Sequence, residues 1–308
     1  MERRIWRTGI TLVMAGLAAA LGVAPATASP TTEAVVHNAS GAAKWSAEDM
    51  RSAIPLDRLV ASPKVSPAEV ARGLETVVQP SAFPTSGATW TGGGAVVTTA
   101  GRVFFTMGAN KASCSGDAVT SANQSVVITA GHCVKYQGAW HTDWIFVPAY
   151  DNGTAPYGQW SAKSTLSTPQ WVQSEDMNYD VGAAVVNQLN GQSLGQVVGG
   201  QGIAFNQARN QSMYSFGYPA AAPYDGTKLI YCSGSTFTDF LLTSDHAMNC
   251  GMTGGSSGGP WFLQFNEQTG SGVQASVNSF GYTFLPGYMF GPYFGTDVQN
   301  LYNTAQAL

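Results

Sequence analysis

The chain of 308 residues carries only 14 Lys and Arg and 18 Asp and Glu, which is 10% of the sequence against about 25% in an ordinary soluble protein. Its net charge of −4 supplies no basic face for phosphates, which argues against a nucleic-acid partner. The 36 glycines and the aromatic content of 11%, with so little charge, argue against a coiled coil or a helical repeat. The composition is typical of a β-rich, exported protein.

Residues 1–28 have the pattern of an export signal peptide. Three arginines within the first seven residues are followed by an uncharged apolar stretch over residues 10–23 and by Ala26-Thr27-Ala28, the small residues that precede a cleavage site. The apolar stretch is shorter than the ~20 residues needed to cross a bilayer, so a membrane anchor is disfavoured. We therefore predict a secreted, extracellular protein with no membrane association after signal cleavage.

Residues 29–88 differ in composition from the rest of the chain and are predicted to be a propeptide or a linker. Ser46, followed by two acidic residues, is typical of a helix start. Ser66-Pro67-Ala68-Glu69 fits a second helix start, with a capping box and a proline at the first helical position. Prolines and glycines between residues 80 and 94 then interrupt regular structure.

From about residue 101 the pattern changes to short β-branched or aromatic runs with turn residues between them, which predicts an all-β domain. These runs occupy residues 103–106, 125–129, 144–147, 181–186, 213–216 and 274–277. A helical turn is predicted near the C-terminus, over residues 297–302. A domain of about 210 residues is large enough to bury a substantial core.

The four cysteines all lie in this domain, and an even number in an exported chain predicts two disulfides. Three connectivities are possible, of which local pairing gives Cys114–Cys133 and Cys232–Cys250. Each bond would close a loop of about 20 residues and contribute about 3 kcal/mol in the chain-entropy account. Zinc is the alternative, but only His132 lies beside a cysteine, and no CxxC or HExxH motif occurs. We predict no metal and no other cofactor.

A candidate nucleophile, Ser257, lies in the glycine-rich segment Thr253-Gly254-Gly255-Ser256-Ser257-Gly258-Gly259-Pro260-Trp261. A serine hydroxyl becomes a nucleophile only when a base removes its proton. Glycines on both sides allow a tight turn and the close approach of a substrate carbonyl. The amides of Gly255 and Ser257 would then form an oxyanion hole. A flexible Gly/Ser turn is the alternative interpretation.

A candidate base and a candidate carboxylate follow hydrophobic strand signals. His132 ends the run Val127-Ile128-Thr129-Ala130-Gly131, and the next residue is a cysteine that would tether it if bridged. Asp180 opens an apolar strand, where a carboxylate is costly to bury without a partner. Orienting a histidine would supply that partner. Asp176, in the preceding polar loop, is the alternative carboxylate.

Together the Thr-Ala-Gly-His-Cys segment, the Asp-led strand and the Gly-x-Ser-Gly-Gly-Pro segment resemble the chymotrypsin-like, or trypsin-like, serine peptidases. His132, Asp180 and Ser257 also follow that family's order along the chain. The resemblance covers roughly residues 101–308 and is closest to the bacterial secreted branch that includes the glutamyl endopeptidases. Ser215-Phe216-Gly217-Tyr218-Pro219 is similar to a strand-and-turn motif of that branch.

This resemblance implies two packed six-stranded antiparallel β-barrels with the active site in the cleft between them, followed by a short C-terminal helix. It implies an endopeptidase domain over residues 89–308 that acts on polypeptides as a monomer. Ser257 would be the nucleophile, His132 the general base and then acid, and Asp180 the carboxylate that orients the histidine.

Other hydrolase classes fit the order of these residues less well. Gly255-x-Ser257-x-Gly259 also matches the nucleophile elbow of α/β-hydrolases, but those enzymes have their histidine after the serine. No histidine follows His246. A subtilisin arrangement needs an aspartate before the histidine, and Asp117 has no such motif around it. A binding protein that has lost catalysis on the same scaffold is the remaining alternative, although such proteins usually lose one of the three residues.

Two departures from the family pattern bear on maturation and specificity. Ser256 occupies the position where many relatives have an aspartate that pairs with a new N-terminus, so we expect no ammonium–carboxylate switch here. Substrate binding is expected from uncharged residues, which favours an uncharged residue before the cleaved bond. They are Gly251, Met252 and Thr253 at the pocket base, Ser279, Phe280 and Gly281 along the substrate backbone, and Gly291 and Tyr293 on the far wall. Asn278 stands at the position matched to a histidine that accompanies glutamate preference.

Overall fold

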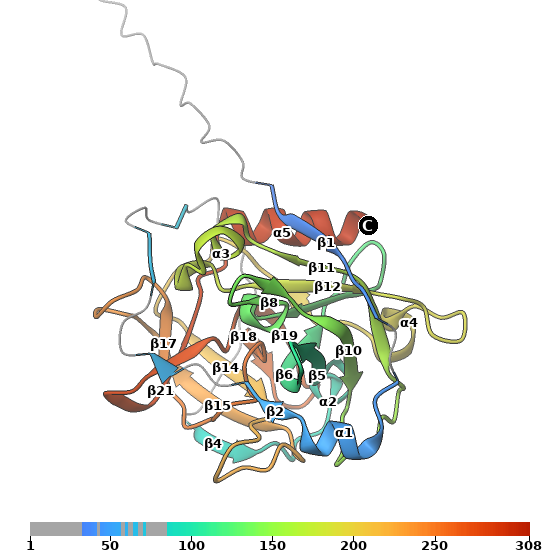
Figure 1. Ribbon diagram of the computed structural model, residues 1–308. Coiled ribbons are helices and arrows are strands. Elements are labelled where there is room, and N and C mark those ends of the chain that lie inside the picture. The colour runs from blue at the N-terminus through green and yellow to red at the C-terminus, as the bar shows by residue number, and fades with distance from the viewer. Residues whose placement is uncertain (1–32, 42–43, 57–58, 61–63, 67–69, 72–84) are drawn as a thin grey trace, which may run out of the picture. The chain divides into compact units, whose positions relative to one another are not determined.

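The computed structural model describes residues 33–41, 44–56, 59–60, 64–66, 70–71 and 85–308 (Figure 1). The predicted export signal lies outside the described residues, as does the predicted helix start over residues 67–69. Within the described part of the chain, no helix has the length and apolar character needed to cross a membrane.

Six strands of the first half close into an antiparallel barrel in the order β11-β10-β5-β6-β7-β12, because β11 also pairs with β12. Their bounds are β5 (Ala100–Met107), β6 (Asn110–Ala118), β7 (Val126–Thr129), β10 (Thr142–Pro148), β11 (Trp160–Ser167) and β12 (Gly182–Val186). The long β5–β6 hairpin keeps one register from Ala100↔Asp117 to Met107↔Asn110. This barrel is the first of the two that the resemblance implies.

The strands of the second half form two sheets. One has the order β13-β19-β18-β14-β15-β4, with β4 (Thr85–Thr89), β13 (Gly202–Ile203), β14 (Ser212–Gly217), β15 (Ile230–Ser235), β18 (Pro260–Asn266) and β19 (Ser271–Val277). The other contains β16 (Phe237–Thr238), β17 (His246–Asn249), β21 (Leu285–Gly291) and β20 (Phe280–Tyr282). Where a second closed barrel was expected, these strands therefore form two separate hydrogen-bonded sheets.

Helices are short, and the longest covers the first barrel. They are α2 (Ala95–Thr99), α3 (Pro169–Ser174), α4 (Leu194–Val198) and α5 (Thr296–Ala307), with 3₁₀ turns η1 (Gly131–Cys133) and η2 (Met177–Tyr179) and a small hairpin of β8 (Lys135–Tyr136) and β9 (Ala139–Trp140). The predicted C-terminal turn is a longer helix, α5, which follows the second half but buries Val298, Leu301 and Ala305 in the core of the first barrel.

The N-terminal segment adds β1 (Val35–Asn38), α1 (Ala47–Ser52), β2 (Ile54–Pro55) and β3 (Leu59–Val60). Helix α1 begins where the sequence predicted, because the Ser46 side chain accepts from the backbone of Asp49 and the Asp49 side chain accepts from Ser46. Strand β1 extends the barrel by pairing with β11, and it lies against that strand in Figure 1.

Alternation along β5 explains how the two halves share a core. Val103 and Phe105 belong to the cluster inside the barrel, while Phe104 between them belongs to a second cluster on the opposite face of the strand. That second cluster includes Tyr214, Phe216 and Phe262 of the second half. Apolar side chains therefore join the halves, and the catalytic candidates lie along the same junction.

Candidate active site

Strand β7 ends at Thr129 and leads directly into η1, which carries His132. Gly131 has no room for a side chain, since a Cβ there would lie 2.8 Å from the Trp171 ring and 2.9 Å from Asp180 Oδ1. The bare backbone lets Asp180 approach the histidine closely. Cys133 is bonded to Cys114 of β6, so the turn is tied covalently to the barrel.

Asp180 holds His132 through both carboxylate oxygens. Oδ1 accepts from the backbone N–H of His132 at 2.7 Å, and Oδ2 lies 2.7 Å from Nδ1 of the imidazole. Ser279 Oγ also donates to Oδ2, at 2.6 Å. The His132 and Asp180 side chains are both fully buried. A proton on Nδ1 is stabilised by this carboxylate, which leaves Nε2 as the basic nitrogen.

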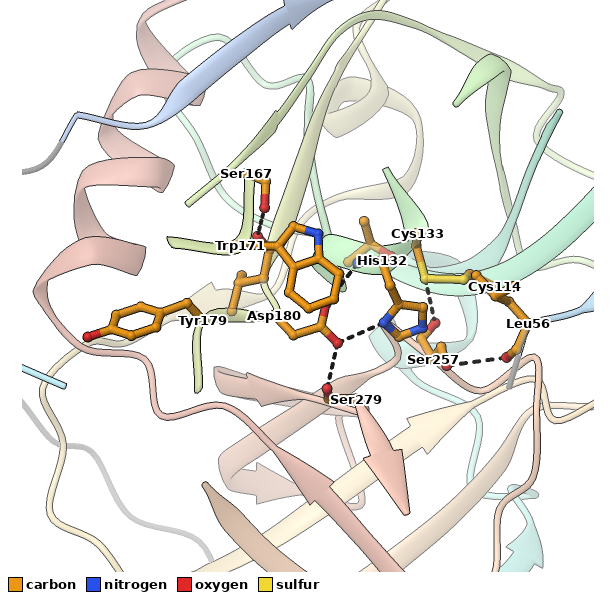
Figure 2. Close-up of polar contacts among 12 residues, drawn as sticks. Leu56, Cys114, His132, Cys133, Ser167, Trp171, Tyr179, Asp180, Ser257 and Ser279 are labelled. Carbon is orange, nitrogen blue, oxygen red and sulfur yellow. Dashed lines mark hydrogen bonds and ion pairs between the residues drawn. A yellow bond between two sulfur atoms is a disulfide. The ribbon is translucent and has the colours of Figure 1, made fainter. Parts of the chain in front are cut away.

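Nε2 of His132 has no hydrogen-bond partner among the described residues. Figure 2 shows it on the side of the imidazole that faces Ser257, with Asp180 on the opposite side. The structure therefore brings the three predicted triad residues together in the order carboxylate, imidazole, hydroxyl. Asp176, the alternative carboxylate, instead caps η2 by accepting from Asn178 N at 3.1 Å.

Three ring N–H groups hold the carbonyls of the histidine turn. His141 Nε2 donates to His132 O at 3.0 Å, Trp144 Nε1 to Cys133 O at 3.0 Å, and Trp171 Nε1 to Lys135 O at 2.9 Å. Burial lowers the pKa of His141 to about 4, so its ring is neutral at ordinary pH. Sequence reasoning did not identify these three positioning residues, because the only local signal was the presence of aromatic residues near the histidine.

The loop of the candidate nucleophile Ser257, called the nucleophile loop below, contains two glycines with left-handed backbone. Gly255 has a φ of +94° and Gly258 a φ of +81°, a region that side chains rarely adopt. A Cβ on Gly258 would lie 2.1 Å from Thr129 Oγ1, so the loop packs directly against the strand that leads to His132. Ser115 N also donates to Ser257 O at 2.7 Å. The loop that carries Ser257, which is itself buried, is therefore held in place by strands of the first half.

Asn278 is a further residue of the nucleophile loop. Its Nδ2 donates to Ser256 O at 3.1 Å and to Phe216 O at 2.9 Å, while its Oδ1 accepts from Ser215 Oγ and Trp261 Nε1, both at 2.7 Å. The side chain is fully buried and does not line the substrate pocket. It holds the carbonyl immediately before the nucleophile, which the sequence pattern alone did not indicate.

A pocket of about 200 Å³ adjoins Ser257. It is lined by all six residues predicted for the pocket base and the substrate strand: Gly251, Met252, Thr253, Ser279, Phe280 and Gly281. Residues 282–283 and 285–289 supply a further part of the wall, and no Asp, Glu, Lys, Arg or His side chain occurs among the lining residues. The pocket is therefore uncharged, and glycines and aromatic residues make up part of its wall.

The two residues predicted for the far wall lie elsewhere. Gly291 pairs with His246 in the sheet, and a Cβ there would lie 2.3 Å from Val277 O. Tyr293 is buried and donates its hydroxyl proton to Gln207 O at 2.8 Å. The hairpin of β20 and β21 has an irregular register between Phe280 and Tyr282, so the wall comes from residues nearer its tip than the sequence match suggested.

The amide of Gly255 is already occupied. Its N–H donates to the backbone carbonyl of Leu56 at 3.0 Å, and Ser257 Oγ donates to the same oxygen at 3.4 Å. Leu56 belongs to the N-terminal segment and appears beside Ser257 in Figure 2. Nothing in the sequence around Leu56 marks it as an active-site residue, because the contact joins positions 201 residues apart.

The cysteines form the two local disulfides, Cys114–Cys133 with S–S 2.04 Å and Cys232–Cys250 with S–S 2.07 Å. Among the described residues, one group has the proximity needed for metal binding, and it consists of Cys114, His132 and Cys133. Its two sulfurs are bonded to each other, and Nδ1 of the histidine faces Asp180. These donors do not fit a metal, since a metal-binding cysteine is a thiolate.

No family model matches the chain. An extracellular metalloprotease of Bacillus subtilis (strain 168) is 36% identical over 83 residues, which is 27% of this chain and 26% of that protein. The match therefore spans about a quarter of that relative's length.

Solved structures match over most of their length. The protease Anisep from Arthrobacter nicotinovorans is 49% identical with a TM-score of 0.66, covering 70% of this chain and 98% of that one. The thermostable serine protease AL20 from an extremophilic microorganism is 43% identical with a TM-score of 0.66, covering 69% and 99%. A Glu endopeptidase at 17% identity and a TM-score of 0.56 covers 72% and 97% and shares the fold. The chain therefore belongs to the bacterial serine proteases of chymotrypsin-like fold.

Proposed function

We propose that the protein is a secreted serine endopeptidase whose nucleophile is Ser257, with His132 as general base and Asp180 as the orienting carboxylate. The observation that carries this proposal is the buried pair of bonds from Asp180 to His132, at 2.7 Å each, with Nε2 left free on the side of Ser257. If the pair of Asp180 and His132 were only structural, the second imidazole nitrogen should also have a hydrogen-bond partner, because buried polar atoms usually do.

The reaction follows from this arrangement. Ser257 Oγ attacks the substrate carbonyl carbon while His132 Nε2 takes the hydroxyl proton. The amides of Gly255 and Ser257 stabilise the oxygen that becomes negative. His132 then gives its proton to the leaving amine, and a water molecule, deprotonated by the same nitrogen, releases the acyl group from Ser257. Asp180 stays ionised throughout and stabilises the imidazolium.

The uncharged pocket supports a preference for an uncharged residue before the cleaved bond. An Arg or Lys side chain would enter a space with no carboxylate to pair with, and a Glu side chain would meet no cation. Met252, Phe280 and Tyr288 instead offer apolar contact to an aliphatic or aromatic side chain. Cleavage of a peptide library by the processed protein tests this preference, and dominant cleavage after Arg or Glu contradicts it.

We also propose export by residues 1–28 and removal of residues 29–88 on maturation, leaving a monomeric peptidase domain over residues 89–308. The similar proteases cover about 70% of this chain, which is the share that such a domain would occupy. Mass spectrometry of the secreted protein tests both boundaries, and a secreted form that keeps residue 29 at its N-terminus would contradict the maturation proposal.

A fluorophosphonate probe tests the catalytic proposal most directly. The processed protein should be labelled and should hydrolyse peptides, whereas Ser257→Ala should do neither. The alternative, a secreted binding protein that has lost catalysis, requires that correctly processed wild-type protein resists the probe. Ser212→Ala is the matched control, because Ser212 is exposed on β14 and lies outside the loop that carries Ser257, so the variant should be labelled like wild type.

A further inference from the structure

The N-terminal segment is docked on the catalytic domain through its own hydrophobic anchors. Trp45 is 3% exposed and Met50 is 2% exposed, and both belong to the apolar cluster between the two halves. Trp45 Nε1 donates to Asp143 O at 3.0 Å, and Lys111 Nζ lies 2.5 Å from Asp49 Oδ1. Helix α1 is thus fixed against the barrel just before the chain reaches the active site.

Leu56 occupies the position that a substrate carbonyl needs. Its N–H donates to Ser113 O at 2.9 Å, and its carbonyl oxygen accepts from Gly255 N at 3.0 Å and from Ser257 Oγ at 3.4 Å. The Ser257 hydroxyl proton therefore points to Leu56 O, and the oxyanion donor Gly255 is already paired. A substrate can use these groups only after Leu56 has left.

The segment crosses the site in the opposite direction to a substrate. If the proposed function holds, the acyl side of a substrate lies along β20, beside the pocket of Phe280 and Gly281, and its leaving side lies toward β6. Here residues 54–55 pair with β6 and come first in the chain, whereas residues 59–60 pair with β20 and come later, and both pairings are parallel. The chain enters from the leaving side and continues along the acyl side.

Reversal explains how a peptide can sit on the nucleophile without being positioned for cleavage. The Leu56 side chain is 7% exposed and belongs to the core cluster of the first barrel, with Cys114 and Cys133. It is not among the residues that line the pocket beside Gly251 and Gly281. Leu56 thus presents a carbonyl to Gly255 while its side chain is directed away from the pocket where the residue before a cleaved bond must bind.

We infer that residues 54–56 are a built-in inhibitor of the catalytic site, held in reverse orientation with the Leu56 carbonyl on the oxyanion donor. The inference rests on the proposed function and adds its regulation: inhibition depends on the anchored segment leaving the cleft. No charge at a new N-terminus is needed for release, which fits the absence of an aspartate at position 256.

Fluorophosphonate labelling of the intact chain, separated by size from any processed form, tests this inference. Intact wild-type protein should be labelled at least about tenfold more slowly than the same protein after its N-terminal segment is removed by limited proteolysis. Leu56→Asp, which places a charge in the apolar site of Leu56, should speed labelling of the intact chain by about ten- to a hundredfold. Val65→Asp is the matched control, because Val65 is 41% exposed, and should label like wild type.

Leu56→Ala provides a milder variant if Leu56→Asp does not give the wild-type circular dichroism spectrum and melting temperature, and it should speed labelling about tenfold. Equal labelling of intact and processed wild-type protein overturns the inference and leaves the catalytic proposal standing. Processed protein that no probe labels overturns the catalytic proposal itself. Folded Leu56 variants that label as slowly as the intact wild type show that the segment does not inhibit through Leu56.

Discussion

The two halves of the molecule contribute to the active site in different ways. The first barrel presents His132 with its carboxylate partner bonded through both oxygens and with ring donors on the surrounding carbonyls. The second half presents Ser257 on a glycine loop, with its hydroxyl directed to Leu56 O. In the proposed mechanism the base, His132, is therefore fully assembled in the intact chain, whereas the proposed nucleophile Ser257 and the proposed oxyanion donor Gly255 are engaged by the chain's own segment. The proposed control of activity therefore acts on the loop of Ser257, here called the serine side, and not on His132 and its partners, the histidine side.

Neutral hydrogen bonds hold the serine side together. Ser256 Oγ donates to Thr253 O, and Ser256 O accepts from Gly259 N at 2.9 Å and from Asn278 Nδ2 at 3.1 Å. An aspartate paired with an ammonium group would serve the same purpose only after cleavage of the chain. Because these neutral bonds exist in the intact chain, the loop is already shaped there, and under the proposed maturation only access to it would have to change.

Breaking the histidine side should have the largest effect. Asp180→Asn keeps the size of the side chain but turns an acceptor into an amide that cannot hold Nδ1–H in the same way. We expect kcat of the processed protein to fall about 10⁴-fold, as for other orienting carboxylates. Asp176→Asn is the matched control and should change kcat less than about threefold, because Asp176 caps η2 and does not contact His132. A larger loss in Asp176→Asn would reverse the two assignments.

Breaking the serine side should cost less activity but more stability. Asn278→Ala leaves the Trp261 and Ser215 donors without their buried acceptor, which should lower the free energy of unfolding by about 3 kcal/mol. The Ser256 carbonyl also loses its clamp, so we expect kcat to fall about tenfold with KM unchanged, because the transition-state contacts shift more than the substrate pocket does.

Urea unfolding and steady-state kinetics measure both effects of Asn278→Ala. Asn187→Ala serves as the control, since the Asn187 amide bonds to Ser161 at an exposed position. If kcat holds while stability falls, Asn278 is a packing residue only. If KM rises with kcat unchanged, Asn278 acts on the pocket and not on the nucleophile loop.

Motifs predicted the catalytic candidates because each is a short local pattern, and the disulfides followed from proximity along the chain. The strand runs predicted an all-β domain, whereas its barrels were implied by the family resemblance. Gly291 and Tyr293, predicted for the far wall, do not line the pocket beside Ser257, and the irregular register of the β20–β21 hairpin is not encoded in any local pattern. Leu56 and Asn278 were missed for a related reason: their roles depend on backbone partners brought together by the fold, and neither residue type signals them.

Acid should weaken the fold around His132 gradually, without a substitution. Unfolded histidine has a pKa near 6.5, while burial lowers the pKa of His141 to about 4 in the fold. Between pH 4 and 6.5 the unfolded chain therefore binds more protons at this residue, so stability falls as pH falls through that window. His141 should account for a loss of about 3 kcal/mol between pH 7 and pH 4.

Urea unfolding of the intact Ser257→Ala chain measures this loss without self-cleavage. His141→Gln keeps an N–H donor near His132 O but cannot titrate, so its stability should fall less between pH 7 and pH 4.5 than that of the parent. His246, whose pKa burial lowers to about 3, contributes a slope of the same sign, whereas Asp117 and Asp245, whose pKa values burial raises, contribute slopes of the opposite sign. His37→Gln is the control: His37 is only partly buried and stacks on Trp140, so the variant should keep nearly all of the parent's slope. If the free energy of unfolding of His141→Gln depends on pH as steeply as that of the parent, burial of His141 does not cause the loss of stability in acid.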